Sequence, residues 1–232
     1  VESIACREDG RLVCRYIQKG ETKEAVSQGV LIATGRRANI RGLFALPSSG
    51  MSDEEAAERL GIRLDRGRIA VDENGRTSLP GVYGAGDVTG GVQLAHAASA
   101  QAINAVAHMW GEPPVFDTSL IPGCVYTEPE IASVGLTQDE AKKKGLEVTA
   151  KKYPMTANGK TVLSGQERGF IRVIADRDTH RILGAQMMCA RATDMISQFS
   201  LAIEQGLTLE QMGAVVYPHP TFSEAIGEAV RG

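Results

Sequence analysis

The sequence has few cysteines, no long apolar run and no strong excess of charge of either sign. Its cysteines form no C-x-x-C pair and no metal-ligand cluster, so we predict no metal site and no closely spaced redox disulfide; they are Cys6, Cys14, Cys124 and Cys189. No apolar stretch approaches the roughly 20 residues of a membrane-spanning helix. The formal net charge is −3 and the lysine run 142–144 is balanced by Asp139 and Glu140, so nucleic-acid binding is not indicated.

The bulk composition is that of a soluble globular protein. The 232 residues are 43% hydrophobic and 23% charged, enough for one large domain or two small ones. No secretory signal opens the chain and the cysteines fit reduced thiols, so a cytoplasmic location is expected. Cys6 and Cys14 would face each other across a hairpin with a three-residue loop. The chain begins at Val1 without a methionine, which we expect to reflect a removed segment, a processed chain or a chain cut within a domain.

Strands are expected near the amino end. Asp9-Gly10 tolerates the positive φ of a tight hairpin turn, so residues 3–7 and 12–17 are predicted to pair around it. A polar loop should follow. The continuous apolar run 29–35 is typical of a strand that is buried on both faces of a sheet.

Two helices are predicted in the middle of the chain. Ser52 and Glu55 form a capping box ahead of a helix that should end just before Gly61, which fits the left-handed position beyond it. A polar strand pair is expected near 68–72. An alanine-rich helix is predicted over 94–110, where small side chains would let its backbone pack close to a sheet or a ligand.

Pro113-Pro114 marks the clearest domain boundary, because prolines resist helix continuation and stiffen a linker. Beyond it we expect one α+β unit, in which a capping box at Thr137 opens one short helix and residues 208–211 open another. Apolar periodicity predicts three longer elements: strands over 169–175 and 181–188 and a helix over 193–205. That helix should turn one face to a core, formed by Met195, Ile196, Phe199, Ala202 and Ile203.

Residues 77–87 carry the first candidate ligand site. Val82-Tyr83 reads as a short buried strand that ends in glycines, and Asp87 follows where ligands bind in open α/β sheets. A carboxylate there accepts hydrogen bonds from sugar or ribitol hydroxyls. A helix beginning near Gln93 would direct its first amide protons to the same place and favour partial negative charge. The alternative is a glycine-rich turn with a helix-capping aspartate; the register with Thr77 favours the ligand site.

His219, flanked by two prolines that restrict the backbone, is the candidate acid–base group. An unperturbed imidazole titrates near pH 6.5, about neutrality, so it can take and return a proton. Glu224, expected on the first turn of a terminal helix, is placed to accept the proton of one ring nitrogen and leave the other as a base. The alternative is a surface histidine in a proline turn. His108 and His180 have no such setting and are expected to face solvent.

Residues 30–37 combine the apolar run with a glycine and the basic pair Arg36 and Arg37. One interpretation is an ordinary strand end with a solvated basic pair. The other is a crossover between two nucleotide-binding domains, with Gly35 near a cofactor.

In combination, these segments resemble the flavoprotein disulfide reductases, and among them most closely the dihydrolipoamide dehydrogenase family. Residues 125–135 are similar to the strand that opens the family's dimer domain. Four motifs occur in the family's order: A-T-G-R-R at 33–37, T-x-x-x-x-V-Y-x-x-G-D at 77–87, L-A-H at 94–96 and H-P-T-x-x-E at 219–224.

The resemblance implies two cofactors, FAD and NAD. Asp87 would hold the ribitol of FAD, and Gly35 would touch the nicotinamide cofactor. Four residues at the start of the alanine-rich helix would line the pyrimidine side of the flavin: Gln93, Leu94, Ala95 and His96. From the residues alone, His96 either lines that pocket or only supports packing.

The resemblance also implies the catalytic pair and the partners. His219 would deprotonate the substrate dithiol, with Glu224 orienting it, and the pair would reach the flavin of the opposite subunit, so activity would require a homodimer. Reducing equivalents would pass from dihydrolipoamide through a redox-active disulfide and FAD to NAD⁺. The partner would be a 2-oxo acid dehydrogenase complex or the lipoyl protein of a glycine cleavage system.

Several departures from the family pattern shape the expected fold. Ala38-Asn39 replaces a frequent proline and an insertion-like loop follows at 44–51; the family's two G-x-G-x-x-G motifs and its C-x4-C pair are absent. The chain should therefore be catalytically inert as it stands. The expected fold class is α/β and α+β, with three parts: 1–35, the tail of an NAD-binding domain; 36–114, the carboxyl-terminal part of an FAD-binding domain; and 115–232, a complete interface domain.

Two alternatives stay open. The parent protein could be another disulfide reductase, such as one for glutathione, because that class uses a histidine and a glutamate in the same place. From a different class, residues 115–232 could act as a non-catalytic dimerisation module, since their apolar helix faces need cover.

Overall fold

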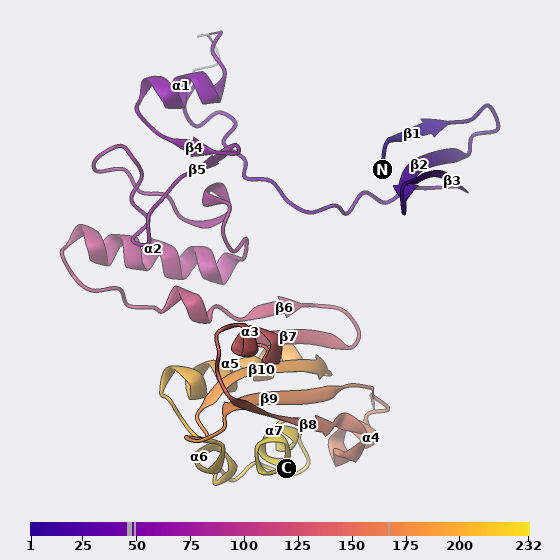
Figure 1. The fold of residues 1–232 in the computed structure, drawn as a ribbon, viewed down its shortest axis with the longest axis vertical. Helices are drawn as coiled ribbons and strands as arrows, with labels where there is room; N and C mark the ends of the chain where they lie inside the picture. The colour runs from indigo at the N-terminus through magenta and orange to yellow at the C-terminus, as the bar shows by residue number, and fades with distance from the viewer. Residues whose placement is uncertain (46–47, 49, 167) are drawn as a thin grey trace. The chain divides into compact units, whose positions relative to one another are not determined.

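The computed structural model describes residues 1–45, 48, 50–166 and 168–232. They divide into two compact units, Val1–Ala38 and Asn39–Gly232, each of which is described by itself. The first unit contains an antiparallel sheet in the order β1-β2-β3 (Figure 1). Its strands are β1 Ser3–Cys6, β2 Leu12–Gln18 and β3 Glu21–Ser27.

The first hairpin confirms the predicted pairing of β1 and β2, but not the facing cysteines. The turn is centred on Asp9, so Cys6 lies opposite Leu12 and Cys14 lies opposite Ile4. The two thiols are therefore diagonal neighbours on adjacent strands rather than a facing pair.

Strand β3 replaces the predicted polar loop. Lys19 and Gly20 have φ angles of 55° and 82°, which is the pair of left-handed residues that a two-residue hairpin turn requires. The turn pairs all seven residues of β2 with β3. Strand β3 was not predicted because its composition is polar, although the turn at Lys19 and Gly20 favours a hairpin.

The predicted buried strand over 29–35 is wrong. The backbone there is irregular and its apolar side chains are exposed, Leu31 by 90% and Ile32 by 72%. A central strand needs neighbouring strands to pair its backbone groups and to cover its side chains. None of the described strands pairs with this segment, so its apolar run has no sheet to enter.

The second unit begins with the predicted capping box. The Ser52 hydroxyl accepts a hydrogen bond from the amide of Glu55, and the Glu55 carboxylate accepts one from the amide of Ser52, at 3.2 and 2.9 Å. They open helix α1, Asp53–Arg59. Gly61 follows with a φ of 77°, as predicted for the residue beyond the cap.

A two-stranded ribbon follows α1, slightly earlier than the strand pair expected near 68–72. It joins β4, Leu64–Asp65, to β5, Arg68–Ile69. The insertion-like loop predicted at 44–51 includes residues 46, 47 and 49, which lie outside the described residues. A small core holds this part together, made of Ile40, Ala57, Ile62 and Ile69.

The alanine-rich helix is confirmed as α2, Ala95–Met109, and it follows a 3-10 turn, η1, Gly86–Thr89. The predicted buried strand Val82-Tyr83 is wrong. Tyr83 makes an isolated bridge with Arg76 and Val82 is exposed, because this segment has a single bridge partner and no strand on its other side among the described residues.

A five-stranded antiparallel sheet organises the remainder, in the order β6-β7-β10-β9-β8. The strands are β6 Gly123–Val125, β7 Glu130–Gly135, β8 Val148–Pro154, β9 Phe170–Asp176 and β10 Ile182–Cys189. The helices are α3 Gln138–Lys143, α4 Gly159–Leu163, α5 Ala192–Glu204, α6 Leu209–Gly213 and α7 Glu224–Arg231, with 3-10 turns η2 Thr118–Leu120 and η3 Met155–Ala157. Both predicted strands, the capping box of α3 and the short helix predicted at 208–211 are confirmed, and α6 also begins with a capping box.

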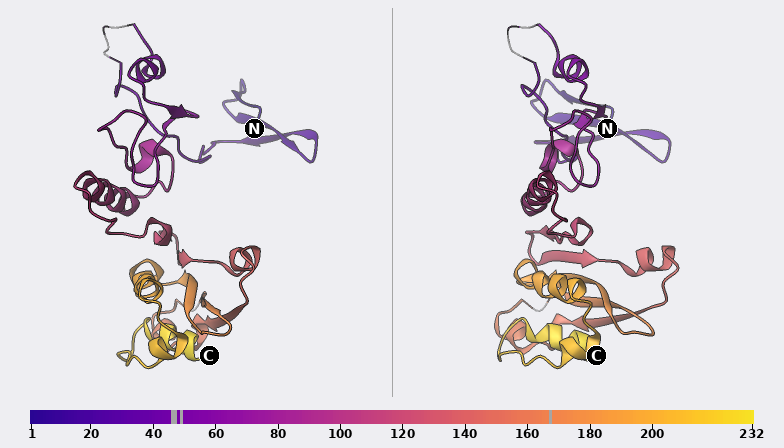
Figure 2. Two further views of the ribbon diagram at one scale, coloured as in Figure 1. Left: turned by 60° about the vertical axis from the view of Figure 1, so that its left-hand side comes forward. Right: turned by 90° about the vertical axis from the view of Figure 1, so that its left-hand side faces the viewer.

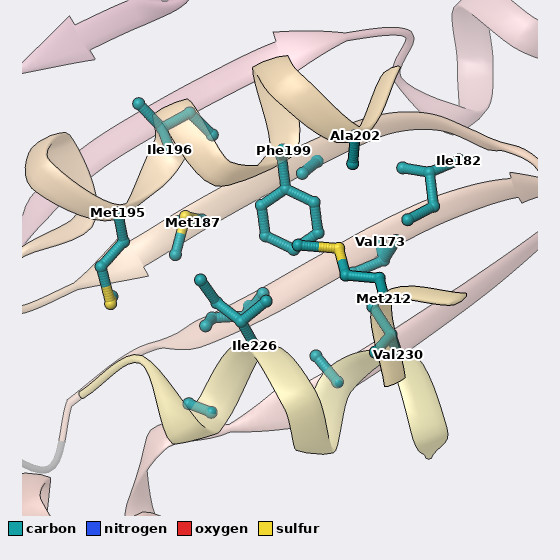
Figure 3. Close-up of a cluster of buried hydrophobic side chains, with 14 of the residues drawn as sticks. Val173, Ile182, Met187, Met195, Ile196, Phe199, Ala202, Met212, Ile226 and Val230 are labelled. Carbon is teal, nitrogen blue, oxygen red and sulfur yellow. The ribbon is translucent and has the colours of Figure 1, made fainter. Parts of the chain in front are cut away.

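Helices α5 and α7 lie over one face of this sheet (Figures 2 and 3) and close the main core. The apolar face predicted for α5 is confirmed, since four of its five side chains are buried and Ile203 is half-buried. Phe199 reaches from α5 toward α7 and is fully buried, as is Ile226 of α7. No helix in the described ranges combines the length and the apolar character needed to cross a membrane.

Candidate active site

The loop before α7 brings His219 and Glu224 into contact. The Nδ1 atom of His219 lies 2.8 Å from Oε1 of Glu224. An ionised carboxylate only accepts hydrogen bonds, so Nδ1 carries a proton, and in the neutral ring Nε2 is then the acceptor. The His219 side chain is 77% exposed and that of Glu224 is 24% exposed. The arrangement therefore presents a basic nitrogen outward from a carboxylate that is held in the loop.

A second contact fixes the carboxylate of Glu224. Its Oε2 atom accepts a hydrogen bond from the amide of Thr221 at 2.8 Å. This amide, and then the His219 ring, hold the pKa of Glu224 below its usual value, because both favour the charged form. The Thr221 hydroxyl donates to the carbonyl of Pro218 at 2.7 Å, and the peptide between His219 and Pro220 is cis.

Helix α7 anchors the pair to the domain. Glu224 is its first residue, as predicted, and the turns that follow carry Ile226 and Val230 into the main core. A polar residue at the start of a helix with a buried apolar stripe has little freedom to move away from the loop before it. The geometry of the pair thus depends on a packed helix rather than on a surface loop alone.

A cavity lies beside this loop. It has a volume of about 750 Å³ and is lined by Phe222, which lies within the His219–Glu224 segment, together with Glu130, Lys160 and Arg191 among others. Its lining carries charges of both signs. Within this lining, Glu130 accepts hydrogen bonds from the backbone and the hydroxyl of Thr193, which hold it in place.

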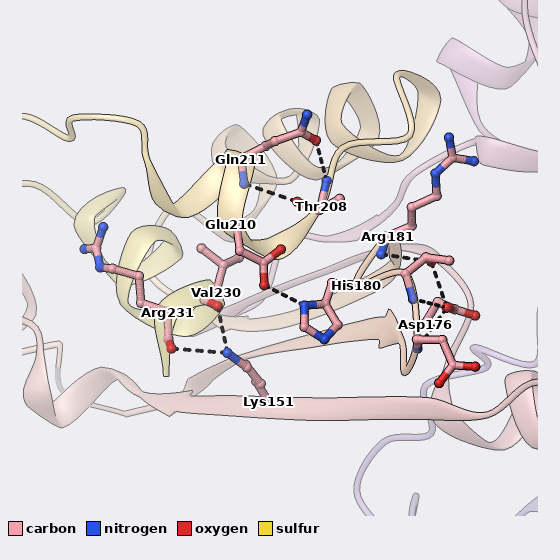
Figure 4. A network of polar contacts seen from close by, with 11 residues as sticks. Lys151, Asp176, His180, Arg181, Thr208, Glu210, Gln211, Val230 and Arg231 are labelled. Atoms are coloured by element: carbon pink, nitrogen blue, oxygen red, sulfur yellow. Dashed lines mark hydrogen bonds and ion pairs between the residues drawn. The ribbon is translucent and has the colours of Figure 1, made fainter.

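The other two histidines singled out as solvent-facing differ from each other. His180 is exposed, as predicted, but its Nδ1 lies 2.6 Å from Oε1 of Glu210 on α6 (Figure 4). The prediction for His108 is wrong, because its ring is half-buried and its Nδ1 lies 2.9 Å from the hydroxyl of Tyr83. A tyrosine 25 residues away in sequence supplied a partner that local context could not reveal.

Asp87 lies exposed in the first turn of η1. Gly86 before it has a φ of 77°, and a Cβ atom there would come within 2.9 Å of the Cβ of Ala98. Its amide donates to the side chain of Gln101 at 2.7 Å. Glycine is therefore required for η1 to pack against α2, and this packing sets where Asp87 stands.

The first residues of α2 have no side-chain cap. Leu94 is the N-cap and makes no capping hydrogen bond, in contrast to the capping boxes of α1, α3 and α6. Gln93 and Leu94 are half-buried, while Ala95 and His96 are exposed. The Nε2 atom of His96 donates to the carbonyl of Pro122 at 2.8 Å, so this ring supports the approach to β6.

Gly35 belongs to the Val1–Ala38 unit and lies in its irregular segment. Its φ of 108° favours glycine, and a Cβ atom there would meet no neighbour within 4 Å. The conformation, and not crowding, is what calls for glycine at this position.

All four cysteines lie in the described part of the chain and all four are free. Burial raises the pKa of Cys189 to about 12 and also raises that of Cys124, so neither is activated as a nucleophile. These two thiols are therefore not suited to exchange with a disulfide substrate.

Sequence reasoning missed two contributors to the site, Asn158 and the backbone of Thr221. The spacing of Asn158 and Thr161 is that of an N-cap and its N3 residue, a signal that was available. That signal predicts the local helix α4, but not the contact of Asn158 with a loop 63 residues away.

Two family models match the chain. The pyridine nucleotide-disulphide oxidoreductase model covers residues 2–102, and the dimerisation-domain model of the same family covers residues 121–230. The two matches together span most of the sequence. The chain belongs to the pyridine nucleotide-disulphide oxidoreductase family, which confirms the predicted resemblance.

Curated relatives named dihydrolipoyl dehydrogenase are similar over most of this chain. One from Bacillus subtilis (strain 168) is 43% identical over 211 residues, which are 90% of this chain and 42% of the relative. Another from Geobacillus stearothermophilus is 38% identical over 224 residues, 96% of this chain and 45% of the relative. The chain thus spans less than half the length of these relatives.

Solved structures share the fold and confirm the predicted fold class. LpdA from Mycobacterium tuberculosis matches with a TM-score of 0.83 and 27% identity, covering 99% of this chain and 47% of that one. The HOCl-induced flavoprotein disulfide reductase RclA from Escherichia coli matches in fold with a TM-score of 0.81 and 24% identity, covering 100% of this chain and 50% of that one.

Proposed function

We propose that this chain is the carboxyl-terminal part of a dihydrolipoamide dehydrogenase. Its parts are then 1–35, the tail of the NAD-binding domain, 36–114, the end of the FAD-binding domain, and 115–232, the interface domain. The observation that carries the proposal is the 2.8 Å contact of His219 with a carboxylate whose pKa is lowered. The similarity to dihydrolipoyl dehydrogenases supports the choice of substrate.

In the proposed mechanism, His219 moves the substrate's protons. Its Nε2 takes a proton from a thiol of the reduced lipoyl group, since Nδ1 is already protonated. Glu224 then faces an imidazolium, and its negative charge stabilises that form. The Thr221 amide keeps Glu224 ionised throughout, so the ring retains one tautomer and returns the proton from the same atom.

The residues near η1 and α2 fit a flavin. Asp87 offers an exposed carboxylate to ribitol hydroxyls, and the uncapped start of α2, with Gln93 and Leu94 before it and Ala95 and His96 in it, offers amide protons to the partial negative charge of a reduced flavin. FAD would accept the two electrons of the dithiol and pass them to NAD⁺. Gly35 would lie against the nicotinamide cofactor, in keeping with its left-handed backbone.

The assembly we propose is a homodimer. The dimerisation domain and the 77% exposure of His219 support it, because an outward-facing base suits a site completed by a second subunit. The lipoyl groups would come from a 2-oxo acid dehydrogenase complex or from the lipoyl protein of a glycine cleavage system. Four free thiols suit a cytoplasmic location.

The test has two arms. The intact protein that contains this chain should oxidise dihydrolipoamide with NAD⁺ far faster than it reduces glutathione disulfide with NADPH; the reverse preference would replace the substrate, and activity with neither would favour a dimerisation module. The 232-residue chain alone should be inactive with both, and clear turnover by it would contradict its assignment as an incomplete enzyme.

A further inference from the structure

Asn158 lies beneath the His219 loop with only 3% of its surface exposed. Its Oδ1 accepts hydrogen bonds from both the amide and the hydroxyl of Thr161, each at 2.9 Å. Its Nδ2 donates to the carbonyl of Thr221 at 3.1 Å. The side chain therefore joins the start of α4 to the loop that precedes α7.

The amide of Asn158 has one possible orientation. The Thr161 amide can only donate and the carbonyl of Thr221 can only accept, so exchanging the two atoms of the Asn158 amide would set like groups against each other at these two contacts. Thr161 is fully buried, and the hydrogen bonds from its backbone amide and its hydroxyl keep the Asn158 side chain in this orientation. A buried amide with every contact matched is a rigid support, because each lost contact leaves a polar atom without water.

Thr221 passes this support on to the catalytic pair. Its carbonyl accepts a hydrogen bond from Asn158, its amide donates one to Glu224, and its hydroxyl donates one to the carbonyl of Pro218. The two backbone groups flank one residue, so fixing the carbonyl limits where the amide can point. The order of contacts is Asn158 to Thr221, Thr221 to Glu224, and Glu224 to Nδ1 of His219.

We propose that Asn158 is a positioning residue for His219, holding the Thr221 peptide so that Glu224 keeps the ring in the tautomer with a free Nε2. The proposal rests on the proposed acid–base function of His219. Asn158 touches neither the ring nor the carboxylate, and it acts through Thr221.

The experiment follows the His219 ring by ¹⁵N nuclear magnetic resonance and the Thr221 amide by hydrogen exchange in the 232-residue chain. In Asn158→Ala and Asn158→Asp, the ring should lose its single tautomer and exchange at Thr221 should rise about tenfold, the factor expected for one ordinary hydrogen bond. The aspartate variant keeps the shape but sets an oxygen against the carbonyl. Thr161→Val, the milder change, should shift both readouts less.

Asn104 supplies the matched control. It is also buried and also fastens a loop, accepting from the amides of Val115 and Phe116 and donating to the carbonyl of Phe116. Asn104→Ala should cost comparable stability and leave the His219 ring unchanged. If Asn158→Ala and Thr161→Val lower stability but leave the ring tautomer and Thr221 exchange as they were, Asn158 is only structural and the proposal is overturned.

The intact protein separates this proposal from the one beneath it. There Asn158→Asp should lower kcat about tenfold, in keeping with one lost hydrogen bond, and broaden its pH profile, with KM for dihydrolipoamide little changed. If the ring signals move in Asn158→Asp while neither this variant nor His219→Gln lowers turnover, then the positioning role holds and the acid–base function fails.

Discussion

Residues 121–230, which match the dimerisation-domain model, contain two His–Glu pairs that look alike and differ in how they are held. His219 with Glu224 and His180 with Glu210 each join Nδ1 to Oε1, at 2.8 and 2.6 Å. The side chain of Glu224 is 24% exposed and that of Glu210 is 64% exposed. The shorter contact thus belongs to the pair with the more exposed glutamate, so distance alone does not identify a catalytic pair.

The difference lies in the second contacts. The other oxygen of Glu224 accepts the amide of Thr221, and that residue is fastened to the buried Asn158. Glu210, by contrast, contacts the His180 ring (Figure 4) and groups at the start of its own short helix, its own amide and Thr208. A base that must return to the same position after each proton transfer needs a second contact of the kind that Glu224 makes with Thr221.

The comparison is tested most strongly by replacing each histidine in the intact protein. His219→Gln should lower kcat for dihydrolipoamide oxidation by about 10²–10⁴, the usual worth of a positioned acid–base group. His180→Gln should leave kcat within twofold, because its ring is placed by a surface contact alone. Steady-state kinetics with NAD⁺ as acceptor measures both; equal losses in the two variants would erase the distinction.

A comparably large effect is expected from the helices that carry the glutamates. Ile226 of α7 is fully buried and Met212 of α6 is 5% exposed, and both belong to the main core. Truncating either to alanine should reduce the free energy of unfolding by about 2–5 kcal/mol, measured with urea.

The two truncations should differ in their effect on the rings. Ile226→Ala loosens the helix that begins with Glu224, so the His219 resonances should broaden. Met212→Ala should leave them sharp, which makes it the matched control. Broadening of His219 in Met212→Ala would mean that the pairs share one support.

A smaller effect is expected on the stability of the protein at acidic pH. Backbone hydrogen bonds, first, and then the histidines hold the pKa of both Glu224 and Glu210 below the usual value. A lowered native pKa stabilises the fold above the unfolded value, about 4.3 for Glu. The advantage of the wild type over Glu224→Gln and Glu210→Gln should therefore be present at pH 7 and fade as pH falls through the lowered native values. Urea unfolding between pH 7 and pH 3 measures it; an advantage that grows in acid would reverse the sign.

Local signals predicted much of this site. Glu224 lies five residues after His219, so their contact depends on one turn and one helix start, and the capping boxes at Ser52 and Thr137 likewise depend on neighbours along the chain. The apolar face of α5 was also predictable, because its spacing repeats with the helix turn.

Contacts between distant segments were not predictable in this way. The apolar run 29–35 predicted a strand, but a strand forms only where another strand lies beside it and pairs its backbone groups. Strand β8 was missed, since Lys151 and Lys152 in its middle hide an alternation in which the two side chains lie on opposite faces. Asn158 reaches Thr221 across 63 residues, which no spacing rule describes.

The smallest effect is expected from substitutions at the carboxyl end of α7, the end opposite to Glu224. Lys151 donates to the carbonyls of Val230 and Arg231 at 3.0 and 3.1 Å, and Arg231 donates to that of Gly213 at the end of α6 (Figure 4 shows the first two). A cation at a helix carboxyl end contributes about 0.3–1 kcal/mol, so Lys151→Met and Arg231→Met should each lower stability by that amount. Glu224 begins α7, two turns from the Lys151 contact, so Lys151→Met should leave the His219 resonances in place; Lys152→Met, on the other face of β8, is the control. A shift of His219 in Lys151→Met, absent in the control, would show that the whole helix rather than the Thr221 peptide sets the ring.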